Sequence, residues 1–319
     1  MIRQQAFIKK NKMLKGALHV HTNRSDGRYT PEETIKKYKD KGFDFMSLTD
    51  HRIYNFKNFA PETGMTVIPG VENESVGIRY ETRGGYTCFH IVAIGPSKED
   101  GNGYEQDEDT GRADVRSSEA YQPYLDEMHR RNNLTIYCHP EWSSTPARLF
   151  ETQKGHFAME IWNSGSAIAD DDTDAAYWDE ILDGGNRWYG VATDDMHNDS
   201  YLGHGWVMVN AENNINAILE ALKNGEFYSS CGPEIYDFYV ENGKAIIDCS
   251  PVAKVRLHSM NHPKRVTRDE NGNITHAEFD IENAWPTGYE YIRISIVDKD
   301  GKKAWTNPIF FDNGEFPRK

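Results

Sequence analysis

Nine side chains of the kinds that bind metal ions accompany short apolar runs of this sequence, and the histidines among them stand in or just after those runs. They are six histidines and three carboxylates: His19, His21, Asp26, His51, Glu72, His90, His139, Asp195 and His197. Imidazole and carboxylate groups together suit zinc, manganese or iron. Burying this many imidazoles without partners would be costly. We therefore interpret the set as the ligands of a metal site.

The spacing of some of these residues supports that interpretation. In a strand, residues two apart point to the same side, so His19 and His21 can reach one ion. The same parity pairs Asp195 with His197, and it leaves Asp194 as a neighbour that is expected to hydrogen-bond a ligand histidine. Asp26 stands before Gly27, and an Asp-Gly pair is also typical of an ordinary turn.

These residues require a scaffold that brings strand ends together, and the sequence predicts one. Seven short apolar runs read as buried strands: 14–20, 43–49, 65–71, 86–94, 134–138, 157–162 and 188–193. Helices are expected between them: 30–41, 118–131, 145–154, 173–183 and 213–223. This alternation predicts an α/β protein with a parallel sheet, closed or nearly closed into a barrel. In such a barrel, catalytic groups lie at the carboxyl ends of the strands.

The pattern changes near residue 236. Short alternating strands are expected there, at 236–240, 244–248, 252–257, 276–281 and 291–298, and Asn-Gly or Asp-Gly turns separate several of them. We predict two domains, a barrel that carries the metal site over residues 1–235 and a small antiparallel β-sandwich over residues 236–319. The acidic, glycine-containing segment 100–117 is expected to be a surface loop near the site.

Composition excludes several classes of protein. The formal charge is −14, which disfavours a polymeric nucleic acid as partner. No apolar run reaches the length of a membrane span, and the first residues do not resemble a secretory signal. Four widely spaced cysteines read as free thiols. We expect a cytoplasmic protein that acts on a small molecule, and its oligomeric state is left open.

The motifs resemble those of the PHP (polymerase and histidinol phosphatase) superfamily of metal-dependent phosphoesterases. His19-Val20-His21 with Ser25-Asp26-Gly27 is similar to the first motif, and Thr49-Asp50-His51 to the second. Gly70-Val71-Glu72 and His90 are similar to intermediate elements. His139-Pro140 is similar to the third motif, and Asp195-Met196-His197 to the fourth. The resemblance covers roughly the first 200 residues.

The resemblance implies a distorted (β/α)7 barrel and two or three divalent metal ions (Zn, Mn or Fe). It implies that His19, His21, Glu72 and Asp195 bind one ion, and that Glu72 bridges to a second ion held by His90 and His139. Asp26, His51 and His197 would hold a third. The expected function is hydrolysis of a small phosphate ester by a metal-activated water.

Two other functions stay open. The segment 227–235, the strand-rich tail, Arg83-Gly84-Gly85-Tyr86 and Gly203-His204-Gly205-Trp206 are similar to a branch that includes carbaryl hydrolase-like proteins, which implies a carbamate or carboxylic ester hydrolase using the same site. A non-catalytic binding module is the third alternative, and loss of metal ligands would favour it.

Several further residues are candidates for direct roles. Arg24 and Arg52 are the arginines nearest to ligands in sequence, and an arginine fork suits a phosphate. His204 is a candidate proton donor. Glu160 is expected to hold a ligand or substrate group, and Glu141-Trp142 to line the pocket. Cys138 is expected in the core, and Trp285 and Trp305 in core or interface packing. The remaining histidines are expected at the surface: His129, His156, His258, His262 and His276.

Overall fold

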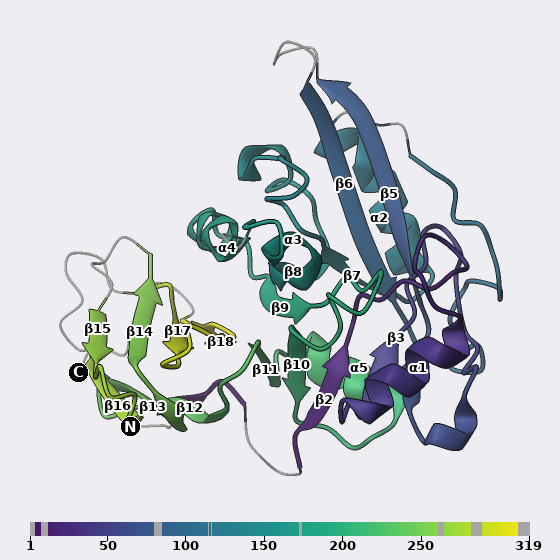
Figure 1. Ribbon diagram of the computed structural model, residues 1–319. Helices are drawn as coiled ribbons and strands as arrows, with labels where there is room; N and C mark the ends of the chain where they lie inside the picture. Colours follow the sequence, from purple (N-terminus) through teal and green to yellow (C-terminus); the bar gives the residue numbers. More distant parts are fainter. Residues whose placement is uncertain are drawn as a thin grey trace.

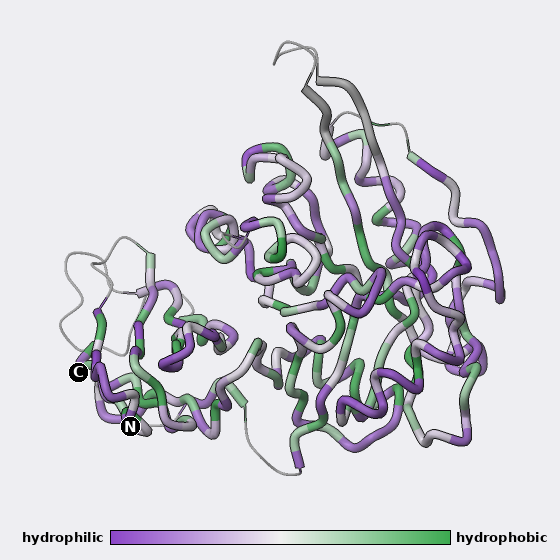
Figure 2. Tube along the Cα trace, viewed as in Figure 1, coloured by the Kyte–Doolittle hydropathy of each residue, from purple (hydrophilic) through white to green (hydrophobic). Residues whose placement is uncertain are grey.

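The computed structural model has a mixed α/β fold in which helices pack beside three β-sheets (Figure 1). It describes residues 4–7, 12–79, 85–113, 115, 117–171, 174–260, 265–281 and 289–311. Arg83, Gly84, His262 and Trp285 lie outside these ranges. The apolar residues, green in Figure 2, lie mainly along the strands and on the inner sides of the helices. Among the described residues, no helix has the length and apolar character that a membrane span requires.

One sheet contains the strands β2 (Leu14–Ala17), β3 (Phe45–Ser47) and β4 (Thr66–Ile68) from the N-terminal part of the chain. These three strands pair in parallel. Strands β10 (Trp206–Val209) and β11 (Phe227–Ser230) continue this sheet on the other side of β2 and run antiparallel. Helices α1 (Pro31–Asp40) and α5 (Ile215–Lys223) connect or follow these strands.

A second sheet contains β5 (Gly70–Arg79), β6 (Gly85–Ile94), β7 (Leu134–Tyr137), β8 (His156–Asn163) and β9 (Tyr189–Thr193), in that order. Strands β7, β8 and β9 are parallel, but β5 and β6 form a long antiparallel hairpin and β6 is also antiparallel to β7. The prediction of a wholly parallel sheet was therefore wrong. The connection between β5 and β6 is too short for the crossover that parallel strands need. Pro69, which lacks an N–H, separates β4 from β5 where one strand was predicted.

The predicted closed barrel is not confirmed, because the described strands form separate open sheets. Two isolated parallel bridges nevertheless join the segments that follow β2 and β3 to the second sheet. One pairs Val20 with Met196, and the other pairs His51 with Glu72. Each bridge contains or lies between predicted metal ligands, so these ligands stand at the seams where the sheets meet.

Four of the five predicted helices are confirmed. Helices α1, α2 (Ser118–Arg130), α4 (Asp174–Asp183) and α5 lie where they were expected, whereas the helix predicted over 145–154 was wrong. That segment contains the 3-10 turn η3 (Ala147–Leu149), which follows Pro146. The buried ring of Phe150 stacks on Tyr137 with centroids 4.0 Å apart, so tertiary packing holds this turn. Two further short elements are η1 (Pro61–Thr63) and α3 (Ser164–Ala167).

The C-terminal strands form two antiparallel layers with a shared core. One layer has the order β1 (Gln4–Gln5), β12 (Ile235–Glu241), β13 (Lys244–Val252) and β16 (Ile274–Asp280). The other has β15 (Arg265–Arg268), β14 (Lys254–Ser259), β17 (Tyr291–Val297) and β18 (Lys303–Thr306), with β19 (Ile309–Phe310) beside β17. Phe238 and Ile247 from the first layer share the core with Ile292, Ile294 and Ile296 from the second.

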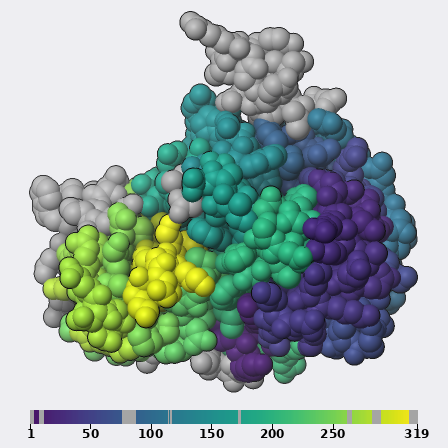
Figure 3. Space-filling view, in the orientation of Figure 1, coloured from purple at the N-terminus to yellow at the C-terminus, as the bar shows by residue number. Residues whose placement is uncertain are grey.

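This C-terminal part occupies one side of the molecule in the space-filling view (Figure 3). It is not separate from the rest in its hydrogen bonding, because β18 pairs with β11. The second layer and the first sheet of the chain therefore form one continuous ten-stranded sheet. Trp305, on β18, is buried as expected for core packing.

Candidate metal centre

The nine predicted ligands lie together around the two seams. His19 and His21 flank Val20 after β2, and Asp195 and His197 flank Met196 after β9. Glu72 and His90 face the same region from β5 and β6, whereas His51 follows β3 and His139 follows β7. The carboxyl ends of parallel strands thus meet the antiparallel hairpin at one place.

Glu72 is the hub of this group. Its Oε2 atom lies 3.2 Å from His19 Nε2, 3.1 Å from His21 Nε2 and 3.1 Å from His51 Nδ1. Its Oε1 atom lies 2.9 Å from His90 Nδ1 and 3.5 Å from His139 Nε2. One buried carboxylate therefore faces five imidazoles with both oxygens, which is the arrangement expected of a bridging ligand.

Asp195 approaches the same two histidines from the opposite strand. Its Oδ1 atom lies 3.2 Å from His19 Nε2 and 3.1 Å from His21 Nε2, and these two ring nitrogens are 3.0 Å apart. Atoms that bind one ion at about 2.0–2.2 Å lie roughly 3 Å from one another. The ring nitrogens of His19 and His21 meet that condition with each other, with Glu72 Oε2 and with Asp195 Oδ1.

Asp26 forms a more exposed group with three histidines. Its carboxylate lies 3.3 Å from His197 Nε2, 3.5 Å from His51 Nε2 and 3.6 Å from His21 Nδ1. The side chain of Asp26 is 54% exposed, so this group lies at the mouth of the centre rather than in its interior.

The residues fit divalent ions, because buried polar atoms face one another here without hydrogen bonds. Glu72 Oε2, Asp195 Oδ1 and His51 Nδ1 are each shielded from solvent and have no hydrogen-bond partner in the described structure. Leaving such groups unsatisfied costs free energy. Their close approach to imidazole nitrogens lacks hydrogen-bond geometry but suits convergence on a shared cation.

The charges of the centre reinforce one another. Burial acts to lower the pKa of His19, but Asp195, Glu72 and Glu160 outweigh it and raise that pKa well above its ordinary value. Burial also acts to lower the pKa of His21, but the carboxylates of Asp195 and Glu72 outweigh it and raise that pKa to about 9. Burial acts to raise the pKa of Glu72, yet the facing histidines hold it well below its usual range. The carboxylates are thus ionised and the centre favours positive charge, which protons on the histidines supply here and which bound cations would supply in their place.

A buried carboxylate that the ligand motifs do not include orients the first histidine. Glu160, on β8, accepts a hydrogen bond from His19 Nδ1 at 2.7 Å and from Thr193 Oγ1 at 2.6 Å. Its other oxygen accepts from the His139 backbone N–H at 2.9 Å. This contact fixes the ring of His19 with Nε2 toward the cluster, a common device in metal sites. The position of Glu160 near the end of a predicted strand was the signal in the sequence that it holds a ligand group.

Among the described residues, no ligand histidine donates a hydrogen bond to Asp194, so that prediction was wrong. Its buried carboxylate accepts hydrogen bonds from Tyr38 Oη, Ser164 Oγ and the backbone N–H groups of residues 203–205. Strand parity turns Asp194 away from the centre, and its role is to anchor the loop after β9. Asp50 acts similarly on the first motif, because it accepts hydrogen bonds from the Thr22 N–H and Ser25 Oγ.

Cys138 also lies close to the centre. Its sulfur is within 4.8 Å of potential ligand atoms of His19 and Glu160. Burial raises the pKa of the Cys138 thiol well above its usual value, and its sulfur donates to the Ile136 carbonyl at 3.5 Å. Because a ligand must be a thiolate, Cys138 serves the core, in which it is fully buried.

Three non-glycine residues at the centre have a strained backbone conformation. His139, Asp195 and Arg52 have positive φ angles of 25°, 49° and 64°. Non-glycine residues rarely adopt this conformation, and it persists where the surroundings enforce it. Two ligands and the residue after a third ligand are therefore held in conformations that cost free energy, which points to a functional constraint.

A cavity of about 520 Å³ opens at the exposed side of the centre. It is lined by Arg24, Ser25, Asp26, His51, Arg52, Ile53, Glu74 and Asp109. Its volume is that of a small-molecule site. Both predicted arginines are present, but each has an acidic partner: Arg24 forms an ion pair with Asp107, and Arg52 Nε lies 3.6 Å from Glu74 Oε1.

Glu74 and Asp109 were not predicted as site residues from the sequence. Glu74 is two residues from Glu72 on β5, so strand parity was a signal that could have found it. Asp109 belongs to the predicted surface loop, which is bound to the site: Thr110 N donates to the Arg52 carbonyl at 2.8 Å, and Ile53 and Asp109 form a bridge. The periodicity of apolar residues in a sequence does not predict that a loop will dock in this way.

Other histidine predictions had mixed outcomes. His204 is exposed on the loop after β9 and does not line the cavity at Asp26, so its proposed role as proton donor stays a prediction. His156 and His258 are buried, so the prediction that they lie at the surface was wrong, whereas His129 is half-buried. His156 bonds Gln153 and Thr135, which explains how its burial is tolerated. His276 is exposed as expected.

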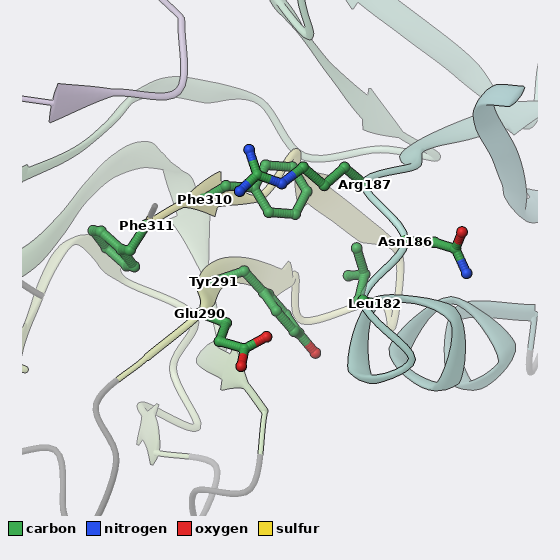
Figure 4. Close-up of a pocket in the computed structure, with 8 residues that line it drawn as sticks. Leu182, Asn186, Arg187, Glu290, Tyr291, Phe310 and Phe311 are labelled. Carbon is green, nitrogen blue, oxygen red and sulfur yellow. The ribbon is translucent and has the colours of Figure 1, made fainter. Parts of the chain in front are cut away.

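A second cavity, of about 370 Å³, lies between the end of α4 and strands β17 and β19 (Figure 4). It is lined by Leu182, Gly185, Asn186, Arg187, Glu290, Tyr291, Phe310 and Phe311. None of these residues is among the nine clustered ligands. The guanidinium of Arg187 lies over the ring of Phe310 at 5.1 Å, so packing accounts for its position.

Comparison with known proteins agrees with the resemblance seen in the motifs. The model of the PHP domain family matches residues 17–144. No curated protein matches the sequence. A two-domain protein from Bacteroides vulgatus, described as containing a predicted PHP-like metal-dependent phosphoesterase, is similar in structure with a TM-score of 0.49 at 15% identity; the match covers 93% of this chain and 95% of that one.

Two other solved structures are similar over smaller parts of the chain. An amidohydrolase from Chromobacterium violaceum, with bound sulfate and no metal, has a TM-score of 0.39 at 16% identity, with coverage of 57% of this chain and 87% of that one. A candidate metal-dependent phosphoesterase from Bifidobacterium adolescentis has a TM-score of 0.38 at 12% identity, with coverage of 66% and 96%.

Proposed function

Because the model of the PHP domain family matches residues 17–144, we propose that the protein is a metal-dependent phosphoesterase. It would hydrolyse a small phosphate ester at a centre of two or three divalent ions held by the nine clustered ligands. Zinc, manganese and iron are the ions that this mixed ligand set suits.

The observation that carries the proposal is the set of unsatisfied buried atoms. Glu72 Oε2, Asp195 Oδ1 and His51 Nδ1 have no hydrogen bond, yet each lies about 3 Å from another metal-type ligand atom. A purely structural cluster would satisfy these atoms with donors. The complete ligand set also disfavours a non-catalytic binding module.

Each side chain has a defined part in this chemistry. Bound divalent ions supply Lewis acidity and make water a nucleophile near neutral pH. Glu160 accepts from His19 Nδ1 and Ser143 Oγ bonds His139 Nδ1 at 3.1 Å, so both rings turn Nε2 toward the centre. Arg52 and Arg24 would orient the substrate at the cavity, and His204 is proposed to protonate the leaving group.

The fold that we propose for this catalytic part is a distorted seven-stranded ring. Its members are β2, β3, β5, β6, β7, β8 and β9, and the bridges Val20–Met196 and His51–Glu72 would complete it. This arrangement would explain why ligands from distant parts of the sequence meet at those two bridges.

Hydrolysis of a carbamate or carboxylic ester is a second candidate, and the charges of the cavity favour it. Asp26, Glu74 and Asp109 line the cavity beside the two arginines. Arg24 is neutralised by Asp107, and Arg52 lies near Glu74. Such a cavity offers less excess positive charge than a dianionic phosphate monoester usually needs, whereas a neutral ester needs none.

The test is a substrate comparison on protein that has been stripped with a chelator and reloaded with one metal at a time. Phosphomonoesters, cyclic nucleotides and aryl esters are assayed in parallel. The proposal predicts metal-dependent turnover of a phosphate ester with the highest kcat/KM. Faster turnover of aryl carboxylic esters than of every phosphate would establish the second candidate instead. Activity that persists after chelation would contradict both.

A further inference from the structure

A large apolar side chain stands exposed directly beside the metal ligands. Trp142 is 53% exposed and lies in the turn that follows ligand His139. Exposed tryptophans are uncommon in folded proteins, and an aromatic side chain at a site mouth often marks a place where a ligand binds. The exposed position of Trp142 therefore suits contact with a bound ligand.

The ring of Trp142 is held against two ligands. Its centroid lies 4.9 Å from that of His139 at an interplanar angle of 78°, and 5.8 Å from that of His90 at 58°. Both contacts are edge-to-face or tilted, which is a favourable arrangement of aromatic rings. A group attached to an ester at the metal centre on this side would meet the tryptophan ring.

The turn that carries Trp142 is fixed at several points. Ser143 N donates to the His139 carbonyl at 3.1 Å, and Ser144 N donates to the Glu141 carbonyl at 2.8 Å. Glu141 N donates to Asp174 Oδ1 on α4 at 3.0 Å. An aromatic platform that is already ordered loses little entropy when a ring stacks on it.

The two sides of the centre differ in character. The Asp26 side is a polar cavity with charged residues of both signs, whereas the His90–His139 side offers an indole ring. An ester likewise has a polar group that is attacked and a leaving group that need not be polar. The polar part fits the ligands and the cavity, and the other part fits Trp142.

We propose that Trp142 is a specificity-determining residue that stacks on an aromatic or heteroaromatic leaving group, so that the site prefers aryl over alkyl substrates. This inference rests on the proposed function, because it places the ester at the metal centre. It commits to a ring on the substrate rather than to a protein partner docking on the tryptophan.

The experiment compares phenylphosphonate with methylphosphonate, which share the polar group and differ in the ring. Binding to the metal-loaded full chain is measured by isothermal titration calorimetry for the wild type, W142A and W142F. The Tyr124→Ala variant is the matched control, because Tyr124 is also exposed (39%) but lies on α2 against Tyr121. Circular dichroism confirms that each variant is folded.

The expected result is tighter binding of phenylphosphonate by the wild type, and a loss of about tenfold for that ligand in W142A, by the usual strength of stacking on an aromatic side chain. W142F retains most of the affinity, and methylphosphonate binding is unchanged in every variant. Equal losses for both phosphonates, no loss for either, or no binding of either by the wild type would overturn the inference. Because the readout is a ratio of affinities without turnover, its failure is distinguishable from the absence of hydrolysis that would refute the proposed function.

Discussion

At the scale of single residues, the ligand motifs predicted the cluster and strand parity explains why. His19 with His21, and Asp195 with His197, are spaced so that each pair faces one side, and the structure brings both pairs to Glu72. Spacing carries no information about contacts between distant segments, however. The hydrogen bonds of Glu160 to His19 and of Asp194 to the loop at 203–205 required the folded chain.

Replacement of Glu160 tests whether orientation of His19 matters for metal binding. In Glu160→Gln the shape is kept, but the charge that holds His19 Nδ1–H is lost. We expect metal affinity to fall by about 10- to 100-fold, as for other carboxylates that support a ligand histidine. A competitive chelator titration measures it. Glu151→Gln, a half-buried acid outside the site, is the control, and equal affinities for the two variants would contradict this role.

At the scale of elements, the starts of helices could be predicted from the sequence, whereas the pairing between strands could be predicted less well. Thr30 accepts a hydrogen bond from Glu33 N, and Glu33 Oε2 accepts one from Thr30 N, which is the capping box typical of a helix start. In contrast, the apolar run 65–71 gave no sign that its end joins a long hairpin. An apolar run has the same composition whether its neighbour is parallel or antiparallel.

A hydrogen-bonded network of two histidines joins α2, β7 and β8, and it makes stability depend on pH. His129 Nε2 and His156 Nδ1 each lie 3.0 Å from Thr135 Oγ1, and His156 Nε2 lies 2.8 Å from Gln153 Oε1. Burial, with the nearby His129, lowers the pKa of His156 to about 3. The neutral ring can donate to Gln153 and accept from Thr135, so this network favours the unprotonated form.

The sign of the effect follows from this lowered pKa. The unfolded chain binds a proton on His156 near the ordinary pKa of 6.5, and the folded chain binds it near 3. The contribution of His156 is complete above pH 6.5 and is lost as the pH falls toward 3, at up to about 1.4 kcal/mol per pH unit. Urea unfolding of the metal-free proteins at several pH values should therefore show that the free energy of unfolding falls more steeply with decreasing pH in the wild type than in His156→Gln. Curves that stay parallel would contradict it, and His204→Gln, at an exposed histidine, is the control.

At the scale of the whole molecule, the change of pattern near residue 236 predicted the antiparallel strands but not their attachment. We retain the division into 1–235 and 236–319 as a proposal. Gln4 and Gln5 pair with β12, and β11 pairs with β18, across that boundary. Arg293 on β17 forms a buried ion pair with Asp179 on α4, and Tyr291 Oη donates to Asp183 at 2.8 Å. Such pairings between distant segments leave no periodic trace in the sequence.

These contacts predict that the chain unfolds as one unit. Differential scanning calorimetry of the metal-free protein should show a single transition with equal calorimetric and van't Hoff enthalpies. Asp179→Ala, which leaves Arg293 buried without its partner, should lower the midpoint, whereas Asp126→Ala at an exposed position on α2 should not. Two separable transitions in the wild type would show that the parts on either side of residue 235 are independent.

The most direct test of the account is the number of divalent ions bound per chain, measured by mass spectrometry of metals after gel filtration. We predict two or three ions in the wild type, one fewer in Asp26→Ala because this exposed carboxylate holds the outer group, and a loss of at least one ion in Asp195→Ala with the fold retained. A folded wild-type protein that binds no divalent ion when metals are supplied would contradict the account.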